Sequence, residues 1–460
     1  MNDSIKVWLW RTAITLAIIV IFAAGFYAEE NGRGVRAWQK CERDLAARGE
    51  TLDWTNYIPA PVPDEQNFFK APSMSDWFTR HETGGTAVSF QSDFNNRATF
   101  EQNLTEITAS NYLAWAEGLE PQLQLIRDAL KRPLARMDGD YSQPFRQPLL
   151  NFVSYRVVAQ MLAHRAKCDL VMNEPDKALE DLTLLHGVNQ TIVKSGERGM
   201  LVAAMIHVAI AGLYVDGVAD GLQSRSWREP ELTALQKQLS EINLLPNVAN
   251  AFRSERAGFC RMLDAFSLDE VFREERINTN FVPSDIGWWF VPSGWVYENK
   301  ALIVDLEGEL LDCMDVTNLT LSPTKAKASY VHSQNALRPM GPDNFIAVQC
   351  LPNFSKAVET MARNQTWADQ ARIACALERY RLANGNYPAA LAALVPHFID
   401  KIPHDIINGL PMSYSCADGQ NFKLWSVGWN EIDDGGITQY TSDGKEDRDF
   451  GDWAWHYPAF

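Results

Sequence analysis

Carboxylates crowd into the last thirty residues of the sequence, in the stretches WNEIDDGG and SDGKEDRDFGDWAW. Eight Asp and Glu residues lie from Asn430 to Asp452 against two basic residues, Lys445 and Arg448, so the local charge is about −6. Like charges held this close repel one another unless a cation or water screens them. Calcium binds six to eight oxygens from carboxylates, amides and backbone carbonyls, which this segment offers without EF-hand spacing. The segment therefore predicts a calcium site, with a magnesium site or an unliganded acidic turn in solvent as the alternatives.

Two histidines are the nearest approach to a catalytic pair. His397 and His404 flank the segment FIDKIP, and Asp400 or Asp405 would be the third group of a metal site or acid/base pair. We expect these imidazoles to cap turns instead. The sequence contains no G-x-S-x-G, P-loop, G-x-G-x-x-G or H-E-x-x-H motif. It therefore favours a protein without catalytic residues, although a hydrolase whose site forms only by long-range contacts is the alternative.

Composition limits the partners of the chain. The 460 residues suffice for two or three domains, and 58 acidic against 42 basic residues give a net charge of −16. This charge argues against nucleic acid, which binds mainly through Lys and Arg. The seven cysteines are at least 25 residues apart, so no C-x-x-C motif occurs. We expect buried thiols, or at most three disulfides if the chain is exported.

The N-terminus carries a segment long enough to cross a membrane. The 17 residues Thr12–Ala28 contain no charge, and VWLW precedes them. Trp8 and Trp10 would lie at the headgroups beside Lys6 and Arg11. We expect an uncleaved membrane anchor. A cleavable signal peptide is the alternative, because small residues occur near the end of the apolar run.

Two features of the sequence predict opposite orientations of this segment in the membrane. Lys6 and Arg11 precede the apolar run, whereas four basic residues follow it, namely Arg33, Arg36, Lys40 and Arg43. The positive-inside count alone places the body of the chain in the cytoplasm. Large domains, however, cross the membrane largely regardless of such charges. We therefore expect a single-pass protein of the inner (cytoplasmic) membrane with most of its chain in the periplasm.

The elements that must position these residues are mainly helical. The proline-rich segment Tyr57–Ser73 predicts an extended connector. From about Glu101 apolar residues recur three and four apart, which predicts packed antiparallel helices with a break at 173–175. Residues 163–182 resemble one tetratricopeptide-like hairpin without a regular repeat array. We expect an irregular helical bundle, with the aromatic group Trp288, Trp289, Phe290 and Trp295 packed in a core.

The last hundred residues change pattern. A long amphipathic helix runs from about Phe354 and ends at Gly385, and Pro388 follows. The segments MSYSCA and FKLWSVG read as short strands joined by the turn DGQN. The fold class is therefore mainly α, with a small α+β domain at the C-terminus. The expected organisation is an anchor at 1–30, an extended membrane-proximal segment at 31–100, a helical domain at 101–353 and the α+β domain at 354–460.

From Ala371 to its end the chain resembles the globular head of the major pseudopilin of type II secretion, which binds calcium in an acidic loop. The helix, ANGNYP, the small sheet and the acidic loop before a tryptophan carry this resemblance. Matching positions are Ser426 and Gly428 at a strand end, Asn430 where the family has Asp, the acidic pair Asp447 and Asp449, and Trp453 as the tryptophan. The insertion 431–444 adds Asp433 and Asp434, which can replace the charge missing at Asn430. The calcium ligands that the resemblance implies are Ser426, Asn430, Asp433, Asp434, Asp447 and Asp449.

The arrangement of the N-terminus differs from that of a pilin subunit. GFYAEE at 25–30 offers a Gly-Phe junction like that of a processed leader, but the apolar run precedes it instead of following it. A pilin-like fibre subunit is therefore a third candidate function, after an envelope scaffold and a hydrolase.

A second resemblance extends across nearly the whole chain. It rests on PVPDEQNF, CDLVMNEPDKALEDL, GWVYENK, IPHDIINGLPMSY, WSVGWNEIDDGG and GDWAWHYP, which are similar to segments of a family of uncharacterised single-span bacterial membrane proteins. This resemblance implies the architecture and no activity. We expect a membrane-anchored envelope protein of the scaffold or interaction type, associated with secretion, that binds a protein partner and no nucleic acid.

Overall fold

The structure, a computed structural model, describes residues 3–80, 85–94, 104–144, 147–194, 200–265, 291–351 and 354–457. It is mainly helical, with 65% of residues in helices, a long apolar N-terminal helix and small C-terminal sheets. Contacts divide the chain into two discontinuous units. Unit 1 comprises Met1–Asp53, Arg256–Leu310 and Ala328–Phe354, and unit 2 comprises Trp54–Glu255, Leu311–Lys327 and Ser355–Phe460. The domain boundaries expected from the sequence remain a prediction.

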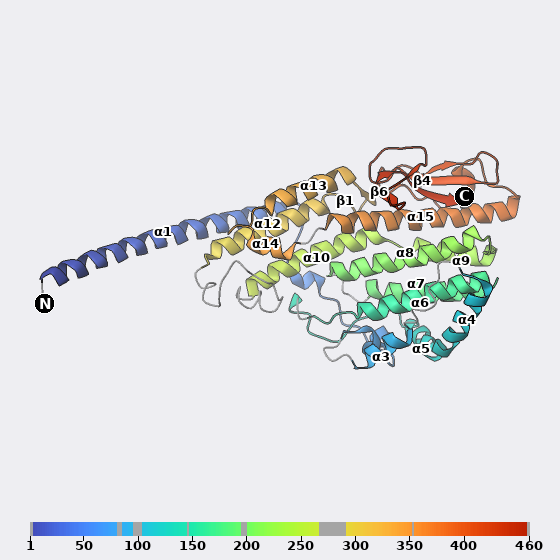
Figure 1. Cartoon of the computed structure of the whole chain (residues 1–460), viewed down its shortest axis with the longest axis horizontal. Coiled ribbons are helices and arrows are strands. Elements are labelled where there is room, and N and C mark those ends of the chain that lie inside the picture. The colour runs from blue at the N-terminus through green and yellow to red at the C-terminus, as the bar shows by residue number, and fades with distance from the viewer. Residues whose placement is uncertain are drawn as a thin grey trace. The chain divides into compact units, whose positions relative to one another are not determined.

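Unit 1 joins the N-terminal helix to parts of three further helices and to one short helix. Their bounds are α1 Asp3–Ala47, α10 Leu244–Ala265, α12 Ser293–Leu311, α13 Pro323–Ala336 and α14 Phe345–Cys350 (Figure 1). Cys41 and Leu45 of α1 are buried with Cys260, Ala301 and Val304. The end of α1 thus belongs to the core of unit 1.

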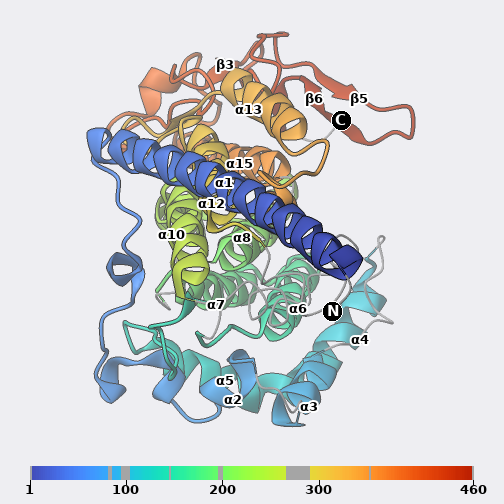
Figure 2. The same cartoon turned by 90° about the vertical axis from the view of Figure 1, so that its left-hand side faces the viewer.

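Unit 2 contains a stack of helices preceded by short 3-10 turns. The elements before the C-terminal part are η1 Trp54–Tyr57, η2 Asp64–Gln66, η3 Phe68–Lys70, α2 Met74–Phe78, α3 Gly85–Phe94, α4 Glu106–Ala116, η5 Glu117–Leu119, α5 Glu120–Leu130, α6 Phe152–Val171, α7 Pro175–Lys194, α8 Leu201–Gln223 and α9 Glu229–Ser240. Helices α6, α7 and α8 pack against one another, with α4 on α6 and α5 on α7 (Figures 1 and 2). The proline-rich segment forms 3-10 turns between extended residues, and Phe68 and Phe69 anchor it in the core.

The break between α6 and α7 follows from its residue types. Asn173 has φ 59, a left-handed conformation that Asn tolerates better than most residues. Pro175 begins α7, where its missing N–H costs no helical hydrogen bond. A helical hairpin therefore forms where the sequence predicts it.

The C-terminal part of unit 2 is a helix packed on a small sheet. Helix α15, Ser355–Asn384, ends at Gly385, whose φ of 82 favours glycine. The main sheet has the antiparallel order β3-β4-β7, with β3 Ser413–Ser415, β4 Phe422–Ser426 and β7 Trp453–Tyr457. Smaller pairs are β1 Met314–Asp315 with β2 Thr320–Leu321, and β5 Thr438–Tyr440 with β6 Glu446–Gly451; η8 covers Leu391–Leu394. Helix α15 contacts β4 and β7, as the sequence pattern predicts.

Two further expectations concern aromatic residues and cysteines. Trp288, Trp289 and Phe290 lie outside the described residues, whereas Trp295 is partly buried against the core of unit 1. All seven cysteines are described and are present as thiols, six of them buried and Cys416 half-buried.

Candidate functional site

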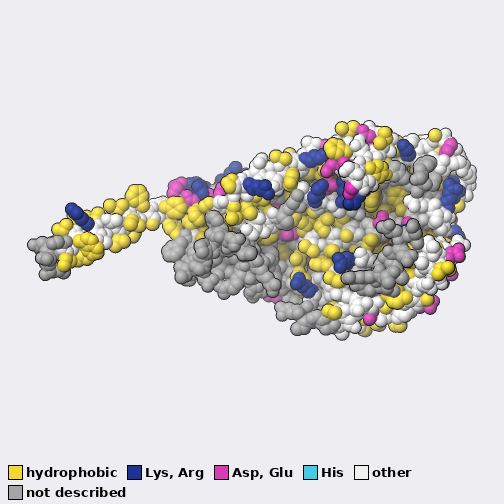
Figure 3. Space-filling view, viewed as in Figure 1, with side chains coloured by type: hydrophobic (Ala, Val, Ile, Leu, Met, Phe, Trp, Pro, Cys, Tyr) yellow, Lys and Arg dark blue, Asp and Glu magenta, His cyan; other side chains and the backbone are white. Residues whose placement is uncertain are grey.

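The N-terminal half of α1 exposes its apolar side chains to the surroundings. None of its most apolar 18-residue window is buried, and Trp10 and Phe22 are 70% and 76% exposed. Figure 3 shows this part of the helix covered with hydrophobic side chains. A helix of this kind is a membrane anchor or a signal sequence, because exposed apolar surface of this length is unfavourable in water.

A second helix, α8, also has the length and composition to cross a membrane. In α8, however, 61% of the apolar window is buried inside the structure. Its buried residues include Val208, Ile210 and Val218, which lie in the core of unit 2. Among the described residues, the N-terminal half of α1 is therefore the membrane-length apolar segment that the rest of the protein leaves exposed.

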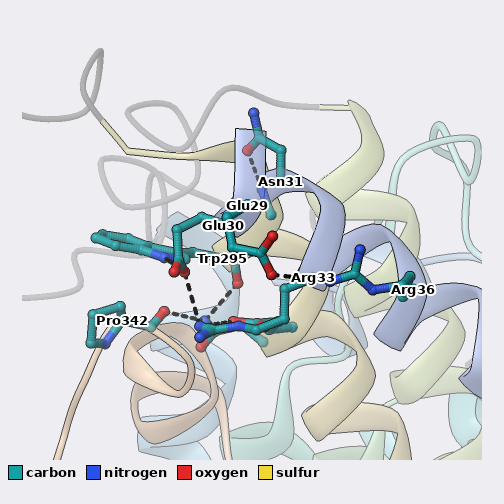
Figure 4. A network of polar contacts seen from close by, with 10 residues as sticks. Glu29, Glu30, Asn31, Arg33, Arg36, Trp295 and Pro342 are labelled. Atoms are coloured by element: carbon teal, nitrogen blue, oxygen red, sulfur yellow. Dashed lines mark hydrogen bonds and ion pairs between the residues drawn. The ribbon is translucent and has the colours of Figure 1, made fainter. Parts of the chain in front are cut away.

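Polar side chains join α1 to the beginning of α12, just after the apolar run (Figure 4). The Asn31 Oδ1 atom accepts hydrogen bonds from the Gly294 backbone N, at 2.9 Å, and from Ser293 Oγ, at 3.1 Å. The Trp295 Nε1 atom donates to Glu30 Oε2 at 2.7 Å. The bond from Gly294 satisfies a backbone N–H in the first turn of α12, which has no carbonyl partner within the helix.

An ion pair strengthens the same junction. Arg33 binds both carboxylate oxygens of Glu298, with Nη2 2.9 Å from Oε2, and also lies 2.9 Å from Glu30. Two parallel hydrogen bonds between a guanidinium and a carboxylate fix the relative orientation of the two side chains. A second residue of α12, the fully buried Asn299, accepts from the Ile346 and Ala347 backbone N atoms and so ties α12 to α14.

The backbones of α1 and α12 are in close contact at two glycines. A Cβ atom on Gly34 would collide with the Gly294 carbonyl, and one on Gly294 would collide with the Glu30 carbonyl. Further along, Lys300 Nζ lies 3.8 Å from the Trp38 ring centroid. The order of these contacts shows that α1 and α12 run parallel, so the N-terminal end of α12 lies nearest to the apolar run.

The acidic segment is organised by Asp452 and by Asp433. Asp452 is buried and accepts from the backbone N atoms of Asp434 at 3.2 Å and Gly436 at 2.6 Å. Asp433 accepts from Trp425 Nε1 at 2.9 Å, and Asn430 Nδ2 donates to Asp434 at 3.3 Å. Burial raises the pKa of Asp452, and the charges of Asp433 and Asp434 raise it further.

The other expected ligands have different surroundings. Ser426 is fully buried, and its hydroxyl donates to Asp405 Oδ1 at 2.8 Å. Asp447 accepts from the Asp449 backbone N at 3.0 Å within β6, and Asp449 lies 3.9 Å from Lys356 of α15. Within the described residues, no group of three or more His, Cys, Asp or Glu side chains has an arrangement that could hold a metal ion.

A small cavity of about 210 Å³ brings together titratable groups that are far apart in the sequence. Its lining includes Asp369 and Arg372 of α15, Asp400 and His404. Burial raises the pKa of Asp369 to about 6, whereas Gln365, Arg372 and His404 act to lower it. The His404 Nε2 atom donates to the Leu319 carbonyl at 3.1 Å.

Of the residues named with His404 in the sequence, Asp400 also lines this cavity, and it lines the pocket of His397 as well. His397 lines a different, shallow pocket, and Asp405 uses its carboxylate to bind Ser426 and the Val427 backbone N. Asp400 lines the cavity of His404 and lies 2.5 Å from Arg372. Asp369 had no sequence signal, because the helical period of α15 shows only that the position is in a helix.

A larger cavity of about 1150 Å³ lies among α4, α5, α6 and α7. Its walls mix apolar residues such as Leu113 and Met172 with charged ones. Arg165, one of the latter, pairs with the fully buried Asp181 at 2.6 Å. Mixed walls of this kind suit an amphipathic ligand or a polypeptide segment.

Comparisons with known proteins give no relative. No family model, curated protein or solved structure matches the chain. Function must therefore be argued from the residues and contacts described above.

Proposed function

We propose that the protein is a single-span membrane protein whose body serves as a scaffold or binding partner in the cell envelope. The exposed apolar half of α1 carries this proposal, because its side chains need a nonpolar environment. The polar junction with α12 supports an uncleaved anchor, since cleavage near Gly25 would leave the junction without a membrane attachment. Sedimentation of the full chain with membranes after alkaline carbonate washing tests it. Release into the supernatant would exclude the anchor.

The proposed location is the inner membrane, with the N-terminus in the cytoplasm and the body in the periplasm. The size of the body supports this orientation, since large domains cross the membrane largely regardless of flanking charge. Burial of six of the seven thiols would also limit their oxidation there. Alkaline phosphatase fused to the C-terminus should be active. If the phosphatase is inactive and a fluorescent protein fused to the C-terminus instead is fluorescent, the body lies in the cytoplasm and the proposed orientation is wrong.

The cavity among α4, α5, α6 and α7 is the proposed contact for a protein partner. Its mixed polar and apolar walls and the tetratricopeptide-like α6–α7 hairpin support this role. Crosslinking in intact envelopes should capture a partner with the wild-type chain and lose it with Met172→Glu, which places a charge on the cavity wall. Gln223→Glu, at an exposed position outside the cavity, is the control. Equal capture by both variants would contradict the assignment.

The C-terminal part is proposed to be a pseudopilin-like head, associated with secretion, that calcium stabilises. Helix α15, the small sheet and the acidic residues between β4 and β7 support this proposal. Calorimetric titration of the full chain should show calcium binding that Asp433→Asn combined with Asp434→Asn removes. The double variant Asp447→Asn with Asp449→Asn tests whether the other two expected carboxylate ligands also contribute to calcium binding. Absence of heat and of any rise in Tm at millimolar calcium would exclude the ion.

A hydrolase is the second candidate, and the cavity of about 210 Å³ is the observation that favours it. Asp369 and His404 both line this cavity, and a carboxyl whose pKa is raised to about 6 can exchange protons near neutral pH. A panel of ester, phosphoester and peptide substrates tests this candidate. Hydrolysis that Asp369→Asn abolishes while the melting temperature is retained would support it, and an inactive wild-type chain would count against it.

A further inference from the structure

The outer end of the membrane-spanning segment can be placed from the length of the helix. From Trp8 to Tyr27 the chain advances 19 residues, or about 29 Å at about 1.5 Å per residue. This distance matches the hydrocarbon thickness of a bilayer, about 30 Å. Aromatic residues lie at both ends, where such side chains prefer the headgroup layer. The boundary nearest the rest of unit 1 therefore falls between Phe26 and Glu30.

Trp295 of α12 lies at this same level. Its ring makes an edge contact with Phe26, with centroids 6.3 Å apart, and its Nε1 atom donates to Glu30 Oε2 at 2.7 Å. The indole thus contacts Phe26 near the end of the span and Glu30 just beyond it. A tryptophan with an apolar body and a satisfied N–H is suited to the headgroup layer.

The contacts of α12 hold Trp295 at this depth. Gly34 and Gly294 bring the two backbones together, Asn31 caps α12, and Arg33 binds Glu298. Because α1 and α12 run parallel, the N-terminal end of α12 cannot move away from the bilayer unless these contacts break. The surface formed by Phe26, Trp295 and Ser293 is called the interfacial face below.

Charge near the interfacial face indicates which feature of the membrane it would recognise. Arg33 is paired with Glu30 and Glu298, and Arg36 with Glu29. Among the described residues of this face, three carboxylates against two guanidiniums leave no excess of positive charge to attract anionic lipids. The contact would therefore depend on the headgroup layer itself and not on the lipid charge.

We infer that the part of unit 1 beyond the span rests on the bilayer through the interfacial face, with Trp295 in the headgroup layer as a second membrane contact beside the span. This inference rests on the proposed function of α1 as an anchor. In this inference Trp295 sets how deeply the protein lies at the membrane surface, in addition to its hydrogen bond with Glu30.

The test uses nitroxide labels on the full chain in lipid vesicles, with Cys416→Ser as the parent because the other six cysteines are buried. Separate variants carry a label at Ser293, at Phe22 in the apolar run and at Arg43, an exposed residue about 20 Å beyond Glu30 along α1. Collisions with oxygen report the lipid phase, and collisions with a nickel chelate report water. The label at Ser293 should be several-fold less accessible to the chelate than the label at Arg43, in phosphatidylcholine with or without phosphatidylglycerol. Trp295→Ala should raise this accessibility while the label at Phe22 stays in lipid.

The outcomes separate this inference from the anchor itself. Equal chelate access at Ser293 and Arg43, with Phe22 in lipid, would overturn the interfacial contact and leave the anchor standing. Protection of Ser293 that Trp295→Ala does not change would overturn the assignment to Trp295. Chelate access at Phe22 would overturn the anchor and with it the inference.

Discussion

A methyl group added at Gly34 should separate α1 from α12 and destabilise unit 1. In Gly34→Ala the new Cβ meets the Gly294 carbonyl, a backbone atom that cannot rotate away. Overpacking of this kind costs about 1–3 kcal/mol. If the helices move apart, the bonds from Trp295 to Glu30 and from Gly294 to Asn31 weaken as well, at about 0.5–1.5 kcal/mol each. Alanine gains about 1 kcal/mol of helix propensity over glycine. The expected net loss of unfolding free energy is therefore about 1–5 kcal/mol, the upper end applying if both hydrogen bonds are lost completely.

The matched control is Gly32→Ala, two residues away on the same helix. A Cβ there meets only the guanidinium end of Arg36, which can move. This variant should be neutral or slightly more stable, because it keeps the propensity gain without the collision. Denaturant unfolding of both variants in detergent gives the comparison, and hydrogen exchange of the first turns of α12 locates the effect. If Gly34→Ala unfolds at the same denaturant concentration as Gly32→Ala, with unchanged exchange in α12, the close contact described here is wrong.

Two further predictions concern buried carboxyl groups. Asp405→Ala should lower the free energy of unfolding by about 2–4 kcal/mol, because the Ser426 hydroxyl and the Ile407 and Val427 backbone N atoms lose their acceptor. Thermal melting measures this loss. The control is Asp400→Ala, at an exposed side chain, which should change the melting temperature little. Burial raises the pKa of Glu255 from 4.5 to about 7. Between these two pH values the folded state therefore keeps a proton on Glu255 that the unfolded state has lost. The free energy of unfolding should therefore be highest below about pH 4.5 and fall by about 1–3 kcal/mol as the pH rises through 7, relative to Glu255→Gln; parallel slopes for both chains in denaturant titrations would refute this linkage.

Several elements followed from local patterns alone. The end of α15 at Gly385 and the turn between α6 and α7 depend on residues with particular backbone preferences, and these lie at the predicted positions. The segments of β3 and β4 contain residues that favour strands, in β4 with alternating apolar and polar side chains, and only a short turn separates them. Their antiparallel pairing could therefore be predicted from neighbouring residues alone. Patterns of this kind act over one or two turns of chain.

The junction and the cavities depend on contacts that such patterns do not report. The sequence beyond residue 30 was expected to form an extended membrane-proximal segment, but Cys41 and Leu45 of α1 are buried against residues more than 200 positions away. The Ser426 hydroxyl, expected among the calcium ligands, donates instead to Asp405. Asp369 and His404 meet in one cavity only because the chain after α15 folds back along that helix.

In the proposed function, α1 is retained as an anchor in the mature protein. The most direct test is the intact mass of the chain recovered from a carbonate-washed membrane pellet. A retained anchor gives a mass that includes the whole apolar run Thr12–Ala28. A mass that corresponds to a start near Gly25, or a chain found only in the supernatant, would contradict it.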